Sequence, residues 1–316
     1  MGYDAAHMPR RIHYAALPTE RVNPASRALD RMTPGQIARL MNREDARAVR
    51  AVGRVQRDIA AAVSLMAAAL RDGGRLFFVG AGTSGRLGVL EAAECPPTFG
   101  TPARLVQAVM AGGRASVFRS REGAEDDARA GARAVRSRVR RDDVLIGITA
   151  SGVTPFVRGA LAAARARGAA TVLVTCNPGR GYGGLARVVI APAPGPEVLA
   201  GSTRLKAGTA TKLVLNTLTT ACMAQLGKMY GNRMVDVLPR SRKLHARALA
   251  LVESLASAPA SRARLALRAA RGRVPVAVVM LRGNLPAASA ARALAAHGNS
   301  LRSTLQSLAV HRPARR

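Results

Sequence analysis

Hydroxyl groups and glycines gather in a short segment that follows an apolar run. Residues 80–85 read Gly-Ala-Gly-Thr-Ser-Gly and come directly after Leu76–Val79. Glycines let the backbone approach an anion closely, and a helix that follows would point its positive N-terminus at that anion. A strand-to-helix turn without a ligand would look similar, but two adjacent hydroxyls favour a bound phosphate. We therefore predict phosphate contacts from Gly82, Thr83 and Ser84.

The same segment formally matches two nucleotide-binding motifs, and both fail on inspection. The dinucleotide pattern needs an acid at the end of the next strand to hold the ribose, whereas that strand runs into Met110–Gly113. The P-loop needs a lysine and then a hydroxyl for magnesium, and Arg86 and Leu87 stand at those positions. The segment is therefore predicted to bind the phosphate of a small molecule rather than a nucleotide.

Two further segments repeat the design of small and hydroxyl residues. Residues 150–155 read Ala-Ser-Gly-Val-Thr-Pro and follow another apolar run, and residues 201–209 read Gly-Ser-Thr-Arg-Leu-Lys-Ala-Gly-Thr. A capped helix start with a solvated basic turn explains the later segment about as well as ligand contact does. The predicted substrate contacts in these segments are Ser151, Gly152, Thr154, Ser202, Thr203 and Lys206.

Two carboxylates are candidates for proton transfer. Glu94 follows the first hydroxyl segment, and Glu125 belongs to an acidic cluster at residues 122–127. The cluster would also suit a helix N-terminus, where negative charge is favourable. General acid–base chemistry needs two carboxylates on one cleft with pKa values pushed apart. Because Glu94 and Glu125 follow different strands near the same sheet edge, they are the predicted catalytic pair. No histidine-based triad and no metal-ligand cluster is expected.

The elements that would position these residues alternate between strand and helix. Continuous apolar strands separated by helices predict an α/β fold, a doubly wound five-stranded parallel sheet that binds ligands at the carboxyl ends of its strands. The expected strands are 76–79, 105–109, 144–148, 172–175 and 188–191. The expected helices are one starting at Thr33–Gln36, 45–70, 86–93, 124–140, 155–167 and 209–230. We expect a helical lead (1–57), the α/β domain (58–238) and a small helical domain (239–316) interrupted by an apolar run at 274–280.

Composition limits the class of protein. The net charge of +31 suggests nucleic acid, but the basic residues are scattered and aromatics make up 3% of the chain, so we expect no specific nucleic-acid partner. No apolar stretch of about 18 residues predicts a membrane span, and no apolar leader follows Met1, so a cytoplasmic protein is expected. The three cysteines are far apart and predict reduced, mostly buried thiols.

Long blocks of the chain resemble a known family. Residues 80–100, which read GAGTSGRLGVLEAAECPPTFG, resemble the signature of the N-acetylmuramic acid 6-phosphate etherases, a family of the sugar-isomerase (SIS) superfamily. Further resemblance covers residues 17–33, 122–127, 143–156, 195–218 and 226–237. The same branch includes the vertebrate glucokinase regulatory protein, which is longer and binds sugar phosphates without catalysis. A sugar-phosphate sensor that regulates a partner protein is therefore the alternative function.

The resemblance implies a reaction and roles for the two glutamates. Such an enzyme cleaves the D-lactyl ether of N-acetylmuramic acid 6-phosphate by elimination and hydration, giving N-acetylglucosamine 6-phosphate and D-lactate. On the matching motifs, Glu94 is the acid that assists lactate departure and Glu125 is the base at C2. The resemblance also implies no metal and no organic cofactor, a homodimer with sites near the subunit contact, and a usual basic residue where this chain has Val153.

Overall fold

The chain forms two compact units. The computed structural model describes residues 17–179, 181–237 and 241–310. Contacts group the residues up to Glu91 with Gln107–Leu218 as one unit, and Ala92–Val106 with the residues from Thr219 onward as the other. The contacts therefore divide the chain earlier than the expected boundary after residue 238, and they also assign the segment around Phe99 to the second unit.

A five-stranded sheet forms the centre of the first unit. Its strands are β1 (Leu76–Gly80), β2 (Val106–Met110), β3 (Val144–Ile148), β4 (Ala170–Val174) and β5 (Val188–Ile190). They lie in the order β2-β1-β3-β4-β5, and β3 pairs in parallel with both β1 and β4, as β5 does with β4. The doubly wound α/β fold is confirmed, and each expected strand is found within a few residues of its predicted bounds.

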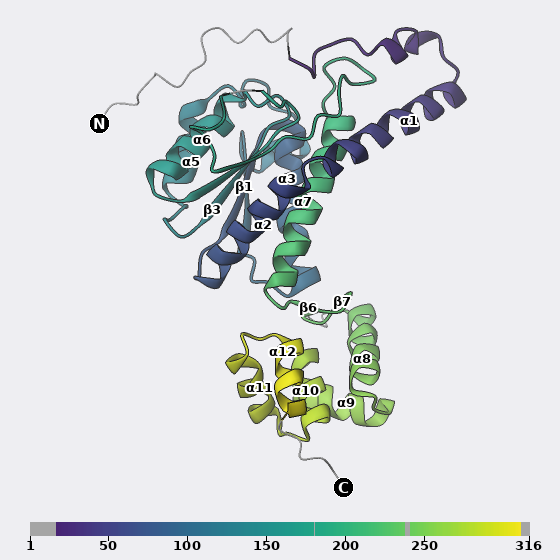
Figure 1. Cartoon of the computed structure of the whole chain (residues 1–316), viewed down its shortest axis with the longest axis vertical. Coiled ribbons are helices and arrows are strands. Elements are labelled where there is room, and N and C mark those ends of the chain that lie inside the picture. Colours follow the sequence, from purple (N-terminus) through teal and green to yellow (C-terminus); the bar gives the residue numbers. More distant parts are fainter. Residues whose placement is uncertain (1–16, 180, 238–240, 311–316) are drawn as a thin grey trace. The chain divides into compact units, whose positions relative to one another are not determined.

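Helices cover both faces of this sheet (Figure 1). The bounds of the first seven are α1 Pro34–Gly53, α2 Gln56–Arg71, α3 Gly82–Phe99, α4 Ala115–Phe118, α5 Ala128–Arg136, α6 Pro155–Ala166 and α7 Lys206–Gln225. Successive residues of a strand point to opposite faces, and Phe77 packs with α5 and α6 in one core cluster. On the other face α3 approaches closely, since a Cβ on Gly88 would lie 2.9 Å from Phe78 Cβ.

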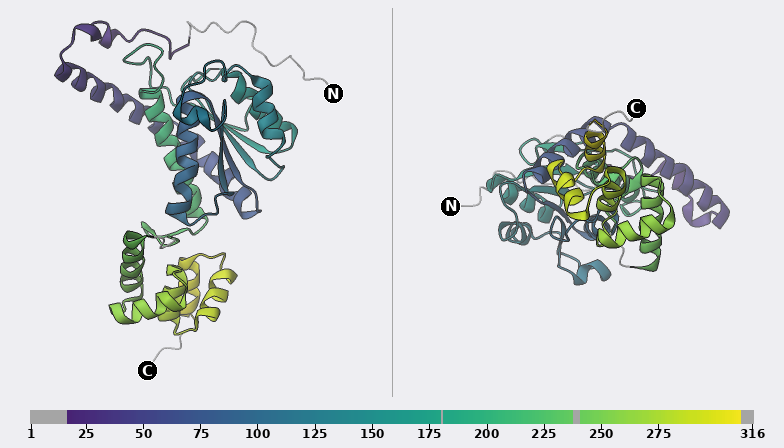
Figure 2. Two further views of the ribbon diagram at one scale, coloured as in Figure 1. Left: turned by 180° about the vertical axis from the view of Figure 1, so that it is seen from behind. Right: turned by 90° about the horizontal axis from the view of Figure 1, so that it is seen from below.

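The long helix predicted over residues 45–70 is two helices. α1 begins at a capping box, in which the side chains of Thr33 and Gln36 accept hydrogen bonds from each other's backbone N–H groups. The helix start predicted at Thr33–Gln36 is therefore confirmed. α1 ends at Gly53, and α2 begins after Val55. Glycine is a poor helix former, which explains the end of α1 at this residue. α1 projects from the sheet in both ribbon views (Figures 1 and 2).

The second unit is mostly helical, as expected. It contains α8 Arg242–Ala256, α9 Ala260–Ala269, α10 Val274–Gly283, α11 Ala287–Ala296, α12 Leu301–Val310 and a short hairpin of β6 Met229–Tyr230 with β7 Arg233–Met234. The expectation that residues 274–280 interrupt the helices is wrong. They form α10, whose residues 274–279 are all buried in the core of this unit, where a helix needs no polar face.

The described residues also answer two expectations drawn from composition. All three cysteines are buried and none of them forms a disulfide, as predicted. No single helix in the described ranges is long and apolar enough to cross a membrane, although α10 and α11 would together pass by length and composition despite a 106° bend between them.

Candidate functional site

A cavity of about 720 Å³ opens where β1, β2 and β3 end. Three loops that follow these strands contribute most of its wall, and the segment before α1 and the loop before α7 complete it. Its polar lining comprises Glu20, Thr83, Ser84, Arg86, Ser116, Ser120, Arg121, Glu122, Glu125, Asp126, Ser151, Thr154 and Thr203. The carboxyl ends of the strands therefore form the site, as the sheet architecture predicts.

The first loop turns sharply from β1 into α3. Gly82 has φ +53°, and Gly85 lies so close to the strand that a Cβ on it would meet Gly80 O at 2.6 Å. α3 begins at Gly82, so Thr83 and Ser84 belong to its first turn, and all three residues line the cavity. Hydroxyls and the positive end of an 18-residue helix are thereby brought to one wall.

A cluster of hydroxyl groups fixes the conformation of the loop after β3. Thr149 Oγ1 lies 2.7 Å from Thr154 Oγ1 and 3.3 Å from Ser151 Oγ, and it accepts a hydrogen bond from Gly152 N. Gly152 has φ +78°, and a Cβ there would lie 2.1 Å from Tyr182 Oη. Ser151, Val153 and Thr154 line the cavity, whereas Gly152 is not among the lining residues and shapes the turn.

Glu125 lies in the cavity wall, and its backbone is fixed to the loop just described. Its carbonyl oxygen accepts a hydrogen bond of 2.9 Å from Phe156 N, in the first turn of α6. The helix expected over 124–140 is shorter, because Asp127 caps α5 by accepting from Ala130 N at 2.7 Å. Residues 122–126 are therefore a loop, and Glu122, Glu125 and Asp126 line the cavity.

Glu94 is not among the residues that line this cavity. It is exposed on α3, about 18 Å along the helix axis beyond Gly82 at 1.5 Å per residue. Leu90, four residues earlier on the same face, is 41% exposed. Glu91, in contrast, is buried and lies 3.3 Å from Lys212 Nζ.

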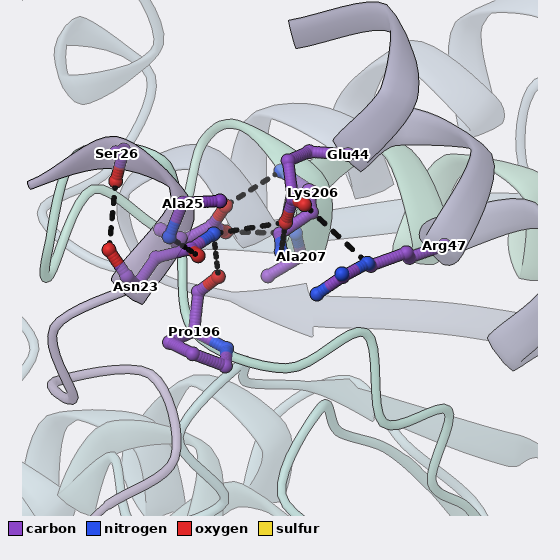
Figure 3. Close-up of polar contacts among 9 residues, drawn as sticks. Asn23, Ala25, Ser26, Glu44, Arg47, Pro196, Lys206 and Ala207 are labelled. Atoms are coloured by element: carbon purple, nitrogen blue, oxygen red, sulfur yellow. Dashed lines mark hydrogen bonds and ion pairs between the residues drawn. The ribbon is translucent and has the colours of Figure 1, made fainter. Parts of the chain in front are cut away.

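The loop before α7 contributes Thr203 to the cavity but not Ser202 or Lys206. The Lys206 side chain is fully buried, and its Nζ lies 2.6 Å from Glu44 Oε2 (Figure 3). Asn23 Nδ2 donates to the same Glu44 oxygen at 2.8 Å. Burial alone would raise the pKa of Glu44, but hydrogen bonds from Lys206 and Asn23 outweigh it and lower that pKa. Lys206 thus ties this loop to α1 instead of facing the cavity.

The N-terminus of α7 is also occupied from within the chain. The Glu197 carboxylate accepts hydrogen bonds of 2.9 Å from Lys206 N and Ala207 N. Burial raises the pKa of Glu197, and these two N–H groups oppose the shift. Because an internal carboxylate takes the first backbone donors of α7, this helix end is not available to a ligand in the way that α3 is.

Sequence reasoning did not single out Glu20, Ser116, Ser120 or Arg121, which also line the cavity. The last three follow β2, and no sequence motif marked them as ligand contacts. The Gly112-Gly113 pair that precedes them was an available signal, since both glycines have positive φ. Among the described residues no group of three His, Cys, Asp or Glu side chains is placed to hold a metal ion.

Comparison with known proteins extends these observations. Residues 58–165 match the family model of the glucokinase regulatory protein N-terminal SIS domain. A Picosynechococcus sp. protein is 48% identical over 290 residues, covering 92% of this chain and 96% of its own. A Gloeobacter violaceus protein is 50% identical over 302 residues, covering 95% and 98%. Each of these two relatives is named N-acetylmuramic acid 6-phosphate etherase.

A phosphoheptose isomerase from Francisella tularensis has a solved structure that is 16% identical, with a TM-score of 0.48, and the match covers 62% of this chain and 98% of that one. The two relatives named above, which are 48% and 50% identical over more than nine-tenths of the chain, show the family to which the chain belongs. The chain belongs to the N-acetylmuramic acid 6-phosphate etherase family.

Proposed function

We propose that this protein cleaves the lactyl ether of N-acetylmuramic acid 6-phosphate to N-acetylglucosamine 6-phosphate and D-lactate, as a carbon–oxygen lyase of cell-wall sugar recycling. The observation that carries the proposal is one cavity lined by two hydroxyl-bearing loops and by Glu125, in a chain of this family. The match to the regulatory-protein model covers only residues 58–165, whereas the named etherases match nine-tenths of the chain. A catalytic function is therefore favoured over a sensor.

The 6-phosphate binds between the loops that follow β1 and β3. Thr83 and Ser84 stand at the start of α3, and Ser151 and Thr154 stand just before α6, so hydroxyl donors and two helix N-termini converge on the cavity. A dianion is stabilised by such donors and by the helix dipoles. Thr203 approaches from the loop before α7.

Glu125 is the base in the proposed reaction. The open-chain aldehyde of the sugar acidifies the C2 proton, which Glu125 removes. The C3–O bond then breaks, and its electron pair leaves with the lactate oxygen as the double bond forms. Water adds at C3 of the unsaturated aldehyde in the second half. The hydrogen bond from Phe156 N to the Glu125 backbone carbonyl supports this role, because it holds the main chain at Glu125 beside the phosphate loop.

Glu94 protonates the departing lactate, and we propose that it does so in the cavity of a second copy of the chain. Glu94 and Leu90 share an exposed face of α3, and Glu94 does not line its own cavity. Phe118, at the end of α4, is 90% exposed. Exposed apolar side chains on these two segments suit a surface covered by a symmetric partner.

Mixing two inactive variants tests this arrangement. In a homodimer that shares sites, a Glu94→Ala chain paired with a Glu125→Ala chain has one intact site. Random reassociation of equal amounts should then restore about a quarter of the wild-type activity, since half of the dimers are mixed and each has one working site. Mixtures that stay inactive, although the mixed dimer is shown to form, would place both glutamates in one chain's site.

The reaction itself is tested by lactate release and by proton exchange. Purified protein should release D-lactate from N-acetylmuramic acid 6-phosphate, and no release would refute the proposed function. Glu94→Ala should block release and retain exchange of the C2 proton with solvent, whereas Glu125→Ala should lose both. Equal exchange in the two variants would contradict the assignment of base and acid.

A further inference from the structure

The connection that follows β2, which includes α4, brings an unpaired hydroxyl and a guanidinium together against one glycine. A Cβ on Gly112 would lie 2.3 Å from Ser116 Oγ and 3.3 Å from Arg121 Cδ, so only glycine leaves room for both side chains. Gly112 also has φ +76°, which other residues adopt at a cost. Ser116 and Arg121 both line the cavity.

Ser116 is a polar group without a partner inside the protein. The residue is 4% exposed, and its Oγ is buried with no hydrogen bond. A buried hydroxyl that makes no hydrogen bond destabilises the folded state by about 1–3 kcal/mol. A hydroxyl of this kind in a cavity wall is therefore placed to contact a bound molecule.

Arg121 differs from the other arginine of the cavity. Arg86 donates to the carbonyl oxygens of Val117 and Ser116 at 2.7 and 3.0 Å, so it supports the loop. Arg121 is exposed in the cavity wall and follows the loop that Arg86 supports. The residue between Gly152 and Thr154, which also lines the cavity, is the apolar Val153. Arg121 is thus the cation that the cavity offers to an anion.

The proposed substrate carries two anionic groups, and different parts of the cavity wall suit each of them. Its phosphate suits the hydroxyl loops and the two helix N-termini. Its lactyl carboxylate would lie among acidic neighbours, since Glu20, Glu122 and Asp126 also line the cavity. A second anion in such surroundings needs a cation, and a guanidinium matches a carboxylate through two parallel hydrogen bonds.

We propose that Arg121 and Ser116 form a subsite for the lactyl carboxylate, with Arg121 as the residue that distinguishes a lactyl ether from a plain amino sugar phosphate. The inference rests on the proposed function, since the carboxylate belongs to that substrate. Arg121 pairs with the carboxylate, and the Ser116 hydroxyl donates a hydrogen bond to it. Neither residue takes part in proton transfer.

Calorimetric binding tests the subsite apart from turnover. In a Glu125→Gln background, which stops the reaction, N-acetylmuramic acid 6-phosphate and N-acetylglucosamine 6-phosphate are titrated separately. Arg121→Ala should weaken binding of the first about 10- to 100-fold, the range expected for a charged hydrogen-bonded pair, and leave binding of the second unchanged. Arg119→Ala is the matched control, because it removes the same charge from the same loop at a residue that does not line the cavity.

The outcomes separate this inference from the function on which it rests. Equal weakening for both ligands would assign Arg121 to the phosphate, and no weakening for either would remove it from the site; each overturns the subsite while the function stands. Failure of the Glu125→Gln protein to bind either ligand would overturn the function as well. Ser116→Ala should weaken only the lactyl ligand, about threefold to tenfold, without lowering the melting temperature, because its hydroxyl makes no internal bond.

Discussion

Loss of the Lys206 charge should destabilise the first unit strongly. Lys206 and Glu44 are each fully buried, with 2.6 Å between Nζ and Oε2. Lys206→Met preserves most of the apolar stem and leaves the Glu44 carboxylate buried without its main partner. Removing one member of a buried pair costs about 3–5 kcal/mol. Asn23 still donates at 2.8 Å and Arg47 Nε lies 3.3 Å away, so we expect the lower end, about 3 kcal/mol.

Scanning calorimetry measures this loss directly. For a domain of roughly 200 residues, about 3 kcal/mol corresponds to a fall of about 6–12 °C in Tm. The Glu44→Gln/Lys206→Met double variant removes both charges of this pair and should lose less than half as much. Arg133→Met removes a partner of Asp127 at 3.5 Å that is 67% exposed, and it should cost at most about 1 kcal/mol.

The pH dependence gives the same prediction a second test. The pKa of Glu44 is lowered in the folded state. The contribution of the Glu44 carboxylate to the free energy of unfolding is therefore complete above the ordinary carboxyl pKa of about 4.3. This contribution is lost as the pH falls through the lowered pKa of the folded state. The difference between wild type and Lys206→Met should shrink on acidification. A single variant no less stable than Arg133→Met, or a double variant as unstable as the single one, would refute the reasoning.

Three further predictions follow from burial and close packing. Burial raises the pKa of Glu197, so ionisation of this carboxyl destabilises the folded state. As pH rises above about 4.3, the free energy of unfolding of the wild type should therefore fall relative to that of Glu197→Gln. A relative rise of this free energy, measured by urea unfolding, would contradict the prediction. A Cβ on Gly131 would lie 2.0 Å from Phe156 O, so Gly131→Ala should destabilise the protein by at least about 2 kcal/mol. A Cβ on Gly35 would have its nearest neighbour at 3.8 Å, so Gly35→Ala should stabilise α1 slightly. Similar changes of Tm in the two variants would be inconsistent with this packing. Burial raises the pKa of Cys176 to about 12, so iodoacetamide at pH 8 should label this thiol only after the protein unfolds. Mass spectrometry measures the labelling, and rapid labelling of Cys176 in the folded protein would disprove the prediction.

Local patterns in the sequence predicted the sheet and two of its loops. The strands are continuous apolar runs because both faces of the sheet are covered. Thr83, Ser84, Ser151 and Thr154 could be found because hydroxyls and glycines adjoin the strand ends. Glu125 could be found because it belongs to an acidic cluster in a basic chain. These signals all come from a few neighbouring residues.

The remaining features depend on residues that are distant in sequence. Nothing near Lys206 shows that Glu44, 162 positions away, would bury its charge. The helical state of residues 274–280 was decided by burial within the second unit rather than by local propensity. Ser116 could not be assigned from sequence, because an unpaired hydroxyl is recognised only once its surroundings are known.

The 162-residue separation between Glu44 and Lys206 also affects how the chain folds during synthesis. At about 5–20 residues per second, Glu44 is made about 8–32 seconds before its partner Lys206. During that interval Glu44 lacks its buried counter-charge, so the ion pair cannot yet stabilise the packing of α1 on the growing sheet. We expect the strands to assemble first and α1 to dock after α7 emerges, which makes the ion pair a late step of folding on the ribosome.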